Sequence, residues 1–136
     1  MKKKILIIDD EPDVIAYLMA ILQANGYETY SNSNVKNGLE LLHDIKPDLI
    51  CLDIMMPHET GLSFYKRFRQ NEEFHQIPVI IISGAIESGK FDFRNYVKDD
   101  AIKVPEAYLE KPINVDEFIQ SVNHLLETKQ LHRSSN

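Results

Sequence analysis

The sequence predicts an α/β fold: a doubly wound, five-stranded parallel sheet with helices on both faces, which together make a three-layer sandwich. Short apolar runs, typical of strands buried on both faces, alternate along the chain with longer segments of helical periodicity. Parallel strands need long crossovers, and the helical segments provide them. The 136 residues suit one domain that is large enough to bury a substantial core.

The first strand and the first helix are expected near the N-terminal end of the chain. Residues 5–8 are four consecutive large aliphatic residues, which indicates a buried strand. Apolar residues then recur at helical spacing between Val14 and Leu22. Pro12 suits the first turn of this helix, and Gly26 is a good C-terminal stop.

A second strand, a second helix and a third strand follow. We expect a short strand at residues 27–30 and a polar turn at residues 31–34. The second helix carries its apolar residues at helical spacing: Val35, Leu39, Leu42 and Ile45. Pro47 ends this helix, and residues 48–53 form a buried strand. The single cysteine, Cys51, lies in that strand and is expected to be a small core residue rather than a reactive thiol.

The second half of the chain continues the alternation. Residues 54–61 have the composition of a loop, and residues 62–70 are expected to form the third helix. Residues 78–83 are apolar up to a final serine, which predicts a fourth buried strand. The short run at residues 107–110 predicts the fifth strand.

The last expected helix runs from Val115 to Leu126. Asn114 is its predicted N-cap, and two acids in the first turn suit the positive end of the helix dipole. Residues 128–136 are short and polar. We therefore expect one domain over residues 1–127, followed by a polar C-terminal tail or the start of a linker.

Composition excludes several classes of function. The net charge of −6 opposes non-specific binding to nucleic acids, so no direct nucleic-acid binding is expected. The apolar run after the N-terminal lysines is too short for a signal peptide. No stretch approaches the ~20 apolar residues of a membrane span, so we expect a cytoplasmic protein without a membrane partner.

Chemically active side chains follow the strands at their carboxyl ends. The acids Asp9 and Asp10, with Glu11 next in sequence, follow the first strand; Asp53 and Ser83 end the third and fourth strands, and Lys111 follows the fifth. Ligands of open parallel sheets bind at this edge. Adjacent carboxylates repel one another there unless a cation compensates them. We expect a divalent cation, assisted by the ammonium of Lys111.

These residues resemble the receiver domain of two-component response regulators, the CheY-like superfamily with a flavodoxin-like (βα)5 fold. The resemblance spans nearly the whole chain, and its motifs occur in the order of the family. They are the acid pair at 9–10, Asp53 with Met56-Pro57 and Gly61, Ser83-Gly84, and Lys111-Pro112.

The resemblance implies a role for each site residue. Asp53 is the implied phosphoacceptor, and Lys111 is the essential lysine, preceding a cis bond to Pro112. Ser83 is the switch hydroxyl and Tyr108 the switch aromatic residue. Asp9 and Asp10 belong to the acidic metal site.

General chemistry is consistent with these roles. Phosphoryl transfer needs a nucleophile and neutralisation of charge on the phosphoryl oxygens, which Lys111 and Ser83 can help to provide. Mg²⁺ (or Mn²⁺) prefers oxygen ligands in octahedral geometry and usually keeps some waters. Asp10, Asp53 and the carbonyl of Met55 could supply the protein ligands, with Asp9 acting through water.

The implied function is a phosphoacceptor that receives its phosphoryl group from a sensor histidine kinase or a phosphotransfer protein. Phosphorylation would then switch binding to a downstream protein that the sequence does not identify, and a homodimer is an assembly that the family allows. Such a domain catalyses only its own phosphorylation and dephosphorylation, so it is not classed as an enzyme.

Three alternatives are open to test. A phosphorylation-independent interaction module of the same shape is the main one, although it would be expected to have lost an acid, the hydroxyl or the lysine. An FMN-binding module would not place acids after its first strand. An aspartate-nucleophile phosphatase would carry an acid where Met55 stands. His58, in the loop after Asp53, is expected to be a solvated side chain.

One segment departs from the family pattern. Ser83 and Lys111 lie 28 positions apart (111 − 83), several more than is usual. Between them, Phe93, Tyr96, Val97 and Ala101 permit a short fourth helix, so an atypical or shortened helix is expected there. Two early glycines, Pro105 and the extra length suggest that residues 84–107 are weakly stable, and we expect this segment, with the fifth strand and the last helix, to form the surface that reads the switch. The alternative is that the insertion is a passive surface loop.

Overall fold

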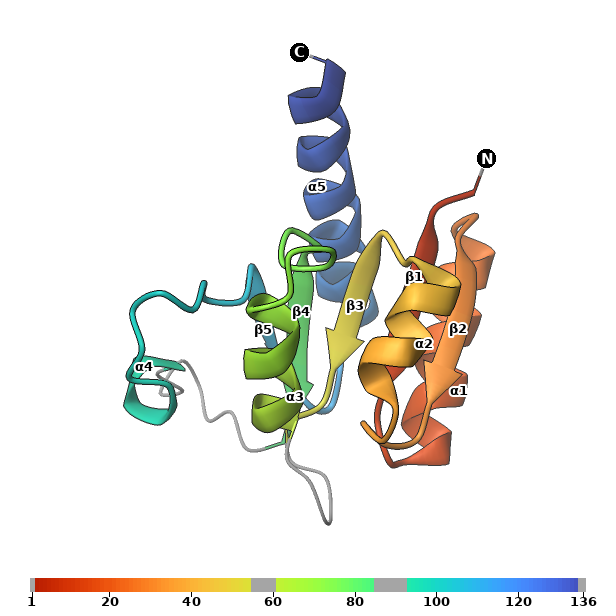
Figure 1. The fold of residues 1–136 in the computed structure, drawn as a ribbon. Helices are drawn as coiled ribbons and strands as arrows, with labels where there is room; N and C mark the ends of the chain where they lie inside the picture. The colour runs from red at the N-terminus through yellow and green to blue at the C-terminus, as the bar shows by residue number, and fades with distance from the viewer. Residues whose placement is uncertain (1, 55–60, 85–92, 135–136) are drawn as a thin grey trace.

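The computed structural model describes residues 2–54, 61–84 and 93–134, and Figure 1 shows their arrangement. Five parallel strands form one sheet in the order β2-β1-β3-β4-β5. The strands are β1 (Lys4–Ile8), β2 (Glu28–Asn32), β3 (Leu49–Leu52), β4 (Val79–Ser83) and β5 (Ala107–Glu110). The predicted five-stranded, doubly wound parallel sheet is confirmed.

Helices connect the strands and cover both faces of the sheet. They are α1 (Pro12–Ala24), α2 (Gly38–Ile45), α3 (Gly61–Arg69), α4 (Phe93–Tyr96) and α5 (Val115–Ser134). Helices α1 and α5 contribute to the core on one face, whereas α2 and α3 pack on the other. Among the described residues, no helix combines the length and apolar character that crossing a membrane requires.

The sheet divides the hydrophobic core into two clusters. Because side chains alternate along a strand, Leu6 and Ile8 of β1 pack toward α2 and α3, whereas Ile5 and Ile7 pack toward α1 and α5. Cys51 belongs to the second cluster and is 1% exposed. Its burial raises the pKa of the thiol, in agreement with the predicted core role.

Two predicted helix ends are confirmed: the C-terminal stop of α1 at Gly26 and the N-cap of α5 at Asn114. Helix α1 ends in a Schellman arrangement: Gly26 has φ +86°, and the N–H groups of Gly26 and Tyr27 donate to the carbonyls of Gln23 and Leu22. At the start of α5, the side chain of Asn114 accepts a hydrogen bond from the N–H of Glu117 at 2.9 Å.

Two other helix boundaries differ from the expectation. Helix α2 begins at Gly38 rather than Val35, because Asn37 adopts a left-handed conformation and interrupts the helix. Gly38 also lies so close to α3 that an added Cβ would come within 2.4 Å of the Phe64 ring. Helix α5 continues past Leu126 to Ser134, through residues with good helix propensity. The domain boundary at residue 127 remains a prediction.

The segment before β5 contains the short fourth helix that the sequence predicts. Helix α4 has four residues, and three apolar side chains from this part of the chain, Phe93, Val97 and Ile102, join the core on the α2–α3 face. Arg94 donates to the carbonyls of Asp99 and Ile102, each at 2.8 Å. Phe93, Val97 and Ile102 are therefore packed into the core, and the weak stability of residues 84–107 remains a prediction.

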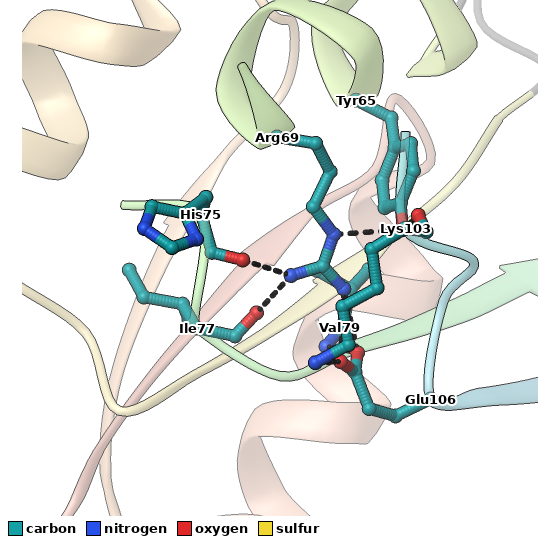
Figure 2. Close-up of polar contacts among 7 residues, drawn as sticks. All are labelled: Tyr65, Arg69, His75, Ile77, Val79, Lys103 and Glu106. Atoms are coloured by element: carbon teal, nitrogen blue, oxygen red, sulfur yellow. Dashed lines mark hydrogen bonds and ion pairs between the residues drawn. The ribbon is translucent and has the colours of Figure 1, made fainter. Parts of the chain in front are cut away.

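A buried arginine anchors this segment to the rest of the domain (Figure 2). Arg69, at the end of α3, makes a bidentate ion pair with Glu106, with Nη2 lying 3.0 Å from Oε1 and 2.7 Å from Oε2. Its Nη1 donates to the carbonyls of His75 and Ile77, and its Nε donates to the hydroxyl of Tyr65.

Glu106 and Tyr65 extend the same network to β4 and to the chain before β5. Glu106 accepts a hydrogen bond from the N–H of Val79 at 2.6 Å and forms an ion pair with Lys103 at 3.0 Å. The Tyr65 hydroxyl donates to the carbonyl of Lys103. We call this set of seven residues the Arg69 cluster: Tyr65, Arg69, His75, Ile77, Val79, Lys103 and Glu106.

Candidate functional site

Backbone hydrogen bonds place the predicted site residues along the carboxyl edge of the sheet. The N–H of Asp9, just past β1, donates to Asn32 at 3.1 Å, and the N–H of Asp53, just past β3, donates to Ile8 at 2.9 Å. These bonds continue the pattern of the sheet by one residue beyond each strand. Both carboxylates are consequently fixed in register with one another.

Lys111 follows β5, the outermost strand beside β4, and lies at the same carboxyl edge of the sheet. Its N–H donates to the carbonyl of Ser83 at 3.3 Å, which ties the end of β5 to the end of β4. The bond between Lys111 and Pro112 is cis, as the resemblance implied.

The ammonium of Lys111 lies at the centre of the site. Its Nζ is 3.0 Å from Oδ2 of Asp9, 2.9 Å from Oε1 of Glu11 and 3.2 Å from Oδ2 of Asp53. Asp9 and Asp53 are buried, with 2% and 3% of their surface exposed, whereas the side chain of Glu11 is 58% exposed. Lys111 thus neutralises part of a carboxylate cluster that extends from the buried sheet edge to solvent.

The acids themselves form a group suited to a divalent cation. Asp9, Asp10, Glu11 and Asp53 each offer a carboxylate oxygen, and these oxygens lie within 4.8 Å of one another. Four carboxylates exceed the charge of one ammonium, and oxygen donors are the ligands that Mg²⁺ prefers. Three predicted metal ligands are brought together, whereas Met55, the predicted carbonyl ligand, lies outside the described residues.

Burial and charge shift two pKa values in the cluster. Desolvation raises the pKa of Asp9, although the N–H of Glu11 and the ammonium of Lys111 oppose this shift. Burial alone would lower the pKa of Lys111, but its bonds to Glu11 and Asp9 and the charge of Asp53 raise it above the usual value. Lys111 is therefore charged at every physiological pH.

Gly61 explains how α3 can begin beside Asp53. A Cβ added to Gly61 would lie 2.2 Å from the carbonyl oxygen of Asp53 and 2.8 Å from Cα of Ile54. The N–H of Gly61 also donates to the carbonyl of Ile54 at 3.1 Å. Only a residue without a side chain permits this approach, which accounts for the glycine among the predicted motif residues.

The two predicted switch residues lie on the neighbouring strands. Ser83 is fully buried at the end of β4, one strand away from β3 and Asp53. Tyr108 lies on β5, in register with Ile81 of β4, and packs half-buried against the α2–α3 cluster. The predicted positions of His58 and Met56-Pro57 lie outside the described residues.

Glu11 is the site residue that the sequence did not assign. The residue follows the acid pair directly and could be suspected from that position, but its contact with Lys111 joins positions 100 apart in sequence. A cavity of about 580 Å³ opens beside this contact. It is lined by Glu11, Asp13, Val14, Tyr17, Lys111, Pro112 and Ile113.

Comparison with known proteins relates the chain to a family of signalling domains. The model of the response regulator receiver domain matches residues 5–123. The polar-differentiation response regulator DivK of Brucella anthropi is 30% identical over 126 residues, which cover 93% of this chain and 98% of that protein.

Solved structures show the same fold. The signal receiver domain of a putative Luxo repressor protein from Vibrio parahaemolyticus superposes with a TM-score of 0.83 at 22% identity, covering 100% of this chain and 98% of that chain. A CheY-like receiver domain protein from Methanospirillum hungatei gives a TM-score of 0.81 at 20% identity, covering 97% and 99%. Taken with the family match over residues 5–123, these findings show that the chain belongs to the response regulator receiver domain family.

Proposed function

We propose that Asp53 accepts a phosphoryl group from a histidine kinase or a phosphotransfer protein. The observation that carries the proposal is the position of Asp53: a buried carboxylate at the carboxyl end of β3, 3.2 Å from the ammonium of Lys111 and within 4.8 Å of three further acids. An oxygen of Asp53 forms a bond to phosphorus while the bond from phosphorus to the donor's histidine nitrogen breaks.

Each neighbouring residue has a specific part in this proposal. Lys111 donates a charge-assisted hydrogen bond to a phosphoryl oxygen, and the Ser83 hydroxyl donates to another. Asp10 and Asp53 would hold Mg²⁺ directly, with Asp9 acting through water and the carbonyl of Met55 as a further proposed ligand. When bound, Mg²⁺ neutralises charge on the phosphoryl oxygens. The chain promotes only its own phosphorylation and dephosphorylation, so it is a signalling domain rather than an enzyme with a separate substrate.

The output of the proposed reaction is a change in which proteins the domain binds. Ser83 moves toward the new phosphoryl group, and the half-buried Tyr108 rotates inward as space opens beside it. Phosphorylation in this way shifts an existing equilibrium between two conformations. A downstream protein then binds the β5 side of the domain in one conformation better than in the other.

The test is phosphorylation by acetyl phosphate with Mg²⁺, followed as acid-labile label on the protein. Asp53→Asn is expected to abolish the label, whereas Asp44→Asn, an exposed acid of α2, is expected to leave it unchanged. Undiminished label in the folded Asp53→Asn variant would show that another residue is the acceptor. A folded wild-type protein that takes no label from either acetyl phosphate or a kinase would favour the phosphorylation-independent interaction module.

A further inference from the structure

The hydrogen-bonding capacity of Lys111 is fully used in this structure. An ammonium group has three N–H donors, and Nζ of Lys111 has three carboxylate partners, in Asp9, Glu11 and Asp53. A phosphoryl oxygen that needs a bond from Lys111 must therefore replace one of these partners. The three partners differ in how readily they can be replaced.

Asp9 and Asp53 are held in place by the fold. Both are buried, and Oδ1 of Asp9 also accepts the N–H of Glu11 at 2.9 Å. Glu11 precedes the first turn of α1, its side chain makes no capping bond there, and it is more than half exposed. Water can replace Glu11 at the ammonium, whereas it cannot readily reach the two buried acids.

Phosphorylation changes the balance between these partners. Once Asp53 carries a phosphoryl group, its carboxyl loses its negative charge, so its attraction for Lys111 falls. Glu11, whose contact of 2.9 Å with Lys111 is the shortest of the three in this structure, keeps its charge and competes with the phosphoryl oxygens for the same ammonium. It also adds a negative charge beside an incoming dianion.

We propose that Glu11 is a positioning residue that retains Lys111 at the solvent side of the site and thereby restrains phosphorylation of Asp53. The cluster of four carboxylates and one ammonium has a net charge of −3, which a divalent cation reduces to −1. Replacing Glu11 by a neutral residue of the same length brings the metal-bound site to neutrality and frees one donor of Lys111. This inference rests on the proposed function of Asp53 and Lys111.

Glu11→Gln tests the inference, with Asp13→Asn as the matched control. Asp13 lies two residues further along the chain and lines the same cavity, but no ion pair joins it to Lys111 in the described part of the structure. Both variants remove one exposed negative charge from the same end of α1. They differ in the contact with Lys111.

The first measurement is the initial rate of labelling by acetyl phosphate at saturating Mg²⁺. Glu11→Gln is expected to raise this rate about two- to five-fold, the range for an exposed ion pair, and Asp13→Asn to change it by less than about 1.5-fold. The gain is expected to shrink with added salt. An equal gain in both variants, or a slower rate in Glu11→Gln, would overturn the inference.

The second measurement asks whether Glu11 acts through Lys111. Binding of beryllofluoride with Mg²⁺, a non-covalent substitute for the phosphoryl group, is followed by calorimetry in Glu11→Gln, Lys111→Gln and the double variant. Glu11→Gln is expected to tighten binding two- to five-fold when Lys111 is present and to have no effect when it is absent. The same tightening without Lys111 would reject a positioning role.

The two proposals can fail separately. If wild-type protein is labelled and Asp53→Asn is not, the acceptor is established, and an unchanged rate in Glu11→Gln then removes the role of Glu11 alone. If Asp53→Asn is labelled as strongly as the wild type, the proposed acceptor itself is wrong. Melting temperatures of all variants identify any effect that comes from loss of folded protein.

Discussion

Replacing Arg69 by methionine removes the centre of the Arg69 cluster while keeping a long apolar side chain in its place. The guanidinium has five N–H groups, and the structure gives it five acceptor contacts: two to Glu106, two to the carbonyls of His75 and Ile77, and one to Tyr65. Its side chain is 1% exposed, so water cannot restore these bonds. The substitution leaves a mostly buried carboxylate and two carbonyls without this donor.

The size of the effect follows from these losses. Removing one partner of a buried ion pair destabilises a protein by about 3–5 kcal/mol, because the other charge stays buried. Glu106 keeps its hydrogen bond from Val79 and its ion pair with Lys103, so we expect a destabilisation near the lower end of this range, about 3 kcal/mol. For a chain of this length, that corresponds to a fall in melting temperature of roughly 10–15 °C.

Urea unfolding followed by circular dichroism measures this loss, since the chain has no tryptophan. Arg67→Met, at an exposed arginine of the same helix, is the control and is expected to cost at most about 1 kcal/mol. Adding Glu106→Leu to Arg69→Met is expected to recover part of the stability by removing the unpaired charge. A loss no larger than in Arg67→Met would refute the reasoning that the cluster stabilises residues 93–106.

Three further predictions concern the site. Mg²⁺ at millimolar concentration is expected to raise the melting temperature, and Asp10→Asn to abolish that rise without destabilising the metal-free protein, because one repulsive charge is gone. Burial raises the pKa of Asp9, so its contribution lowers stability as the pH rises above the ordinary value of 3.8. Asp9→Asn should therefore stabilise the metal-free protein at pH 7 and less so near pH 4 in urea titrations, and a larger gain at pH 4 would contradict this sign. Gly61→Ala is expected to cost about 1–3 kcal/mol and to slow labelling of Asp53, since its Cβ would meet the Asp53 carbonyl at 2.2 Å.

The sheet and the main site residues could be predicted because their signals are local. A strand buried on both faces has to be apolar throughout, and a polar residue at its carboxyl end has to lie at the ligand-binding edge. Asp9, Asp53 and Lys111 were predicted in this way, from neighbours in sequence. The cap at Asn114 is likewise determined within four residues.

The features that the sequence did not predict depend on backbone conformation and on contacts between positions far apart in sequence. Arg69 and Glu106 are 37 residues apart, and each has the residue type of an exposed surface position. The start of α2 is set by the left-handed backbone of Asn37 and by the approach of Phe64, neither of which a pattern of apolar residues reveals. Glu11 was visible as a third acid, but its partner lies 100 positions away.

The Arg69 cluster also bears on how the domain could be re-engineered. Strand β5 is anchored at both ends. Before the strand, Glu106 binds Arg69 of α3 and the N–H of Val79 in β4; after it, the N–H of Lys111 donates to the carbonyl of Ser83. A change in composition at the exposed residues 98–101, outside the core, is therefore expected to stop at this anchored position and to leave Lys111 in place. Foreign recognition peptides could be grafted there, which would give the domain a new binding partner while its acidic edge keeps its geometry.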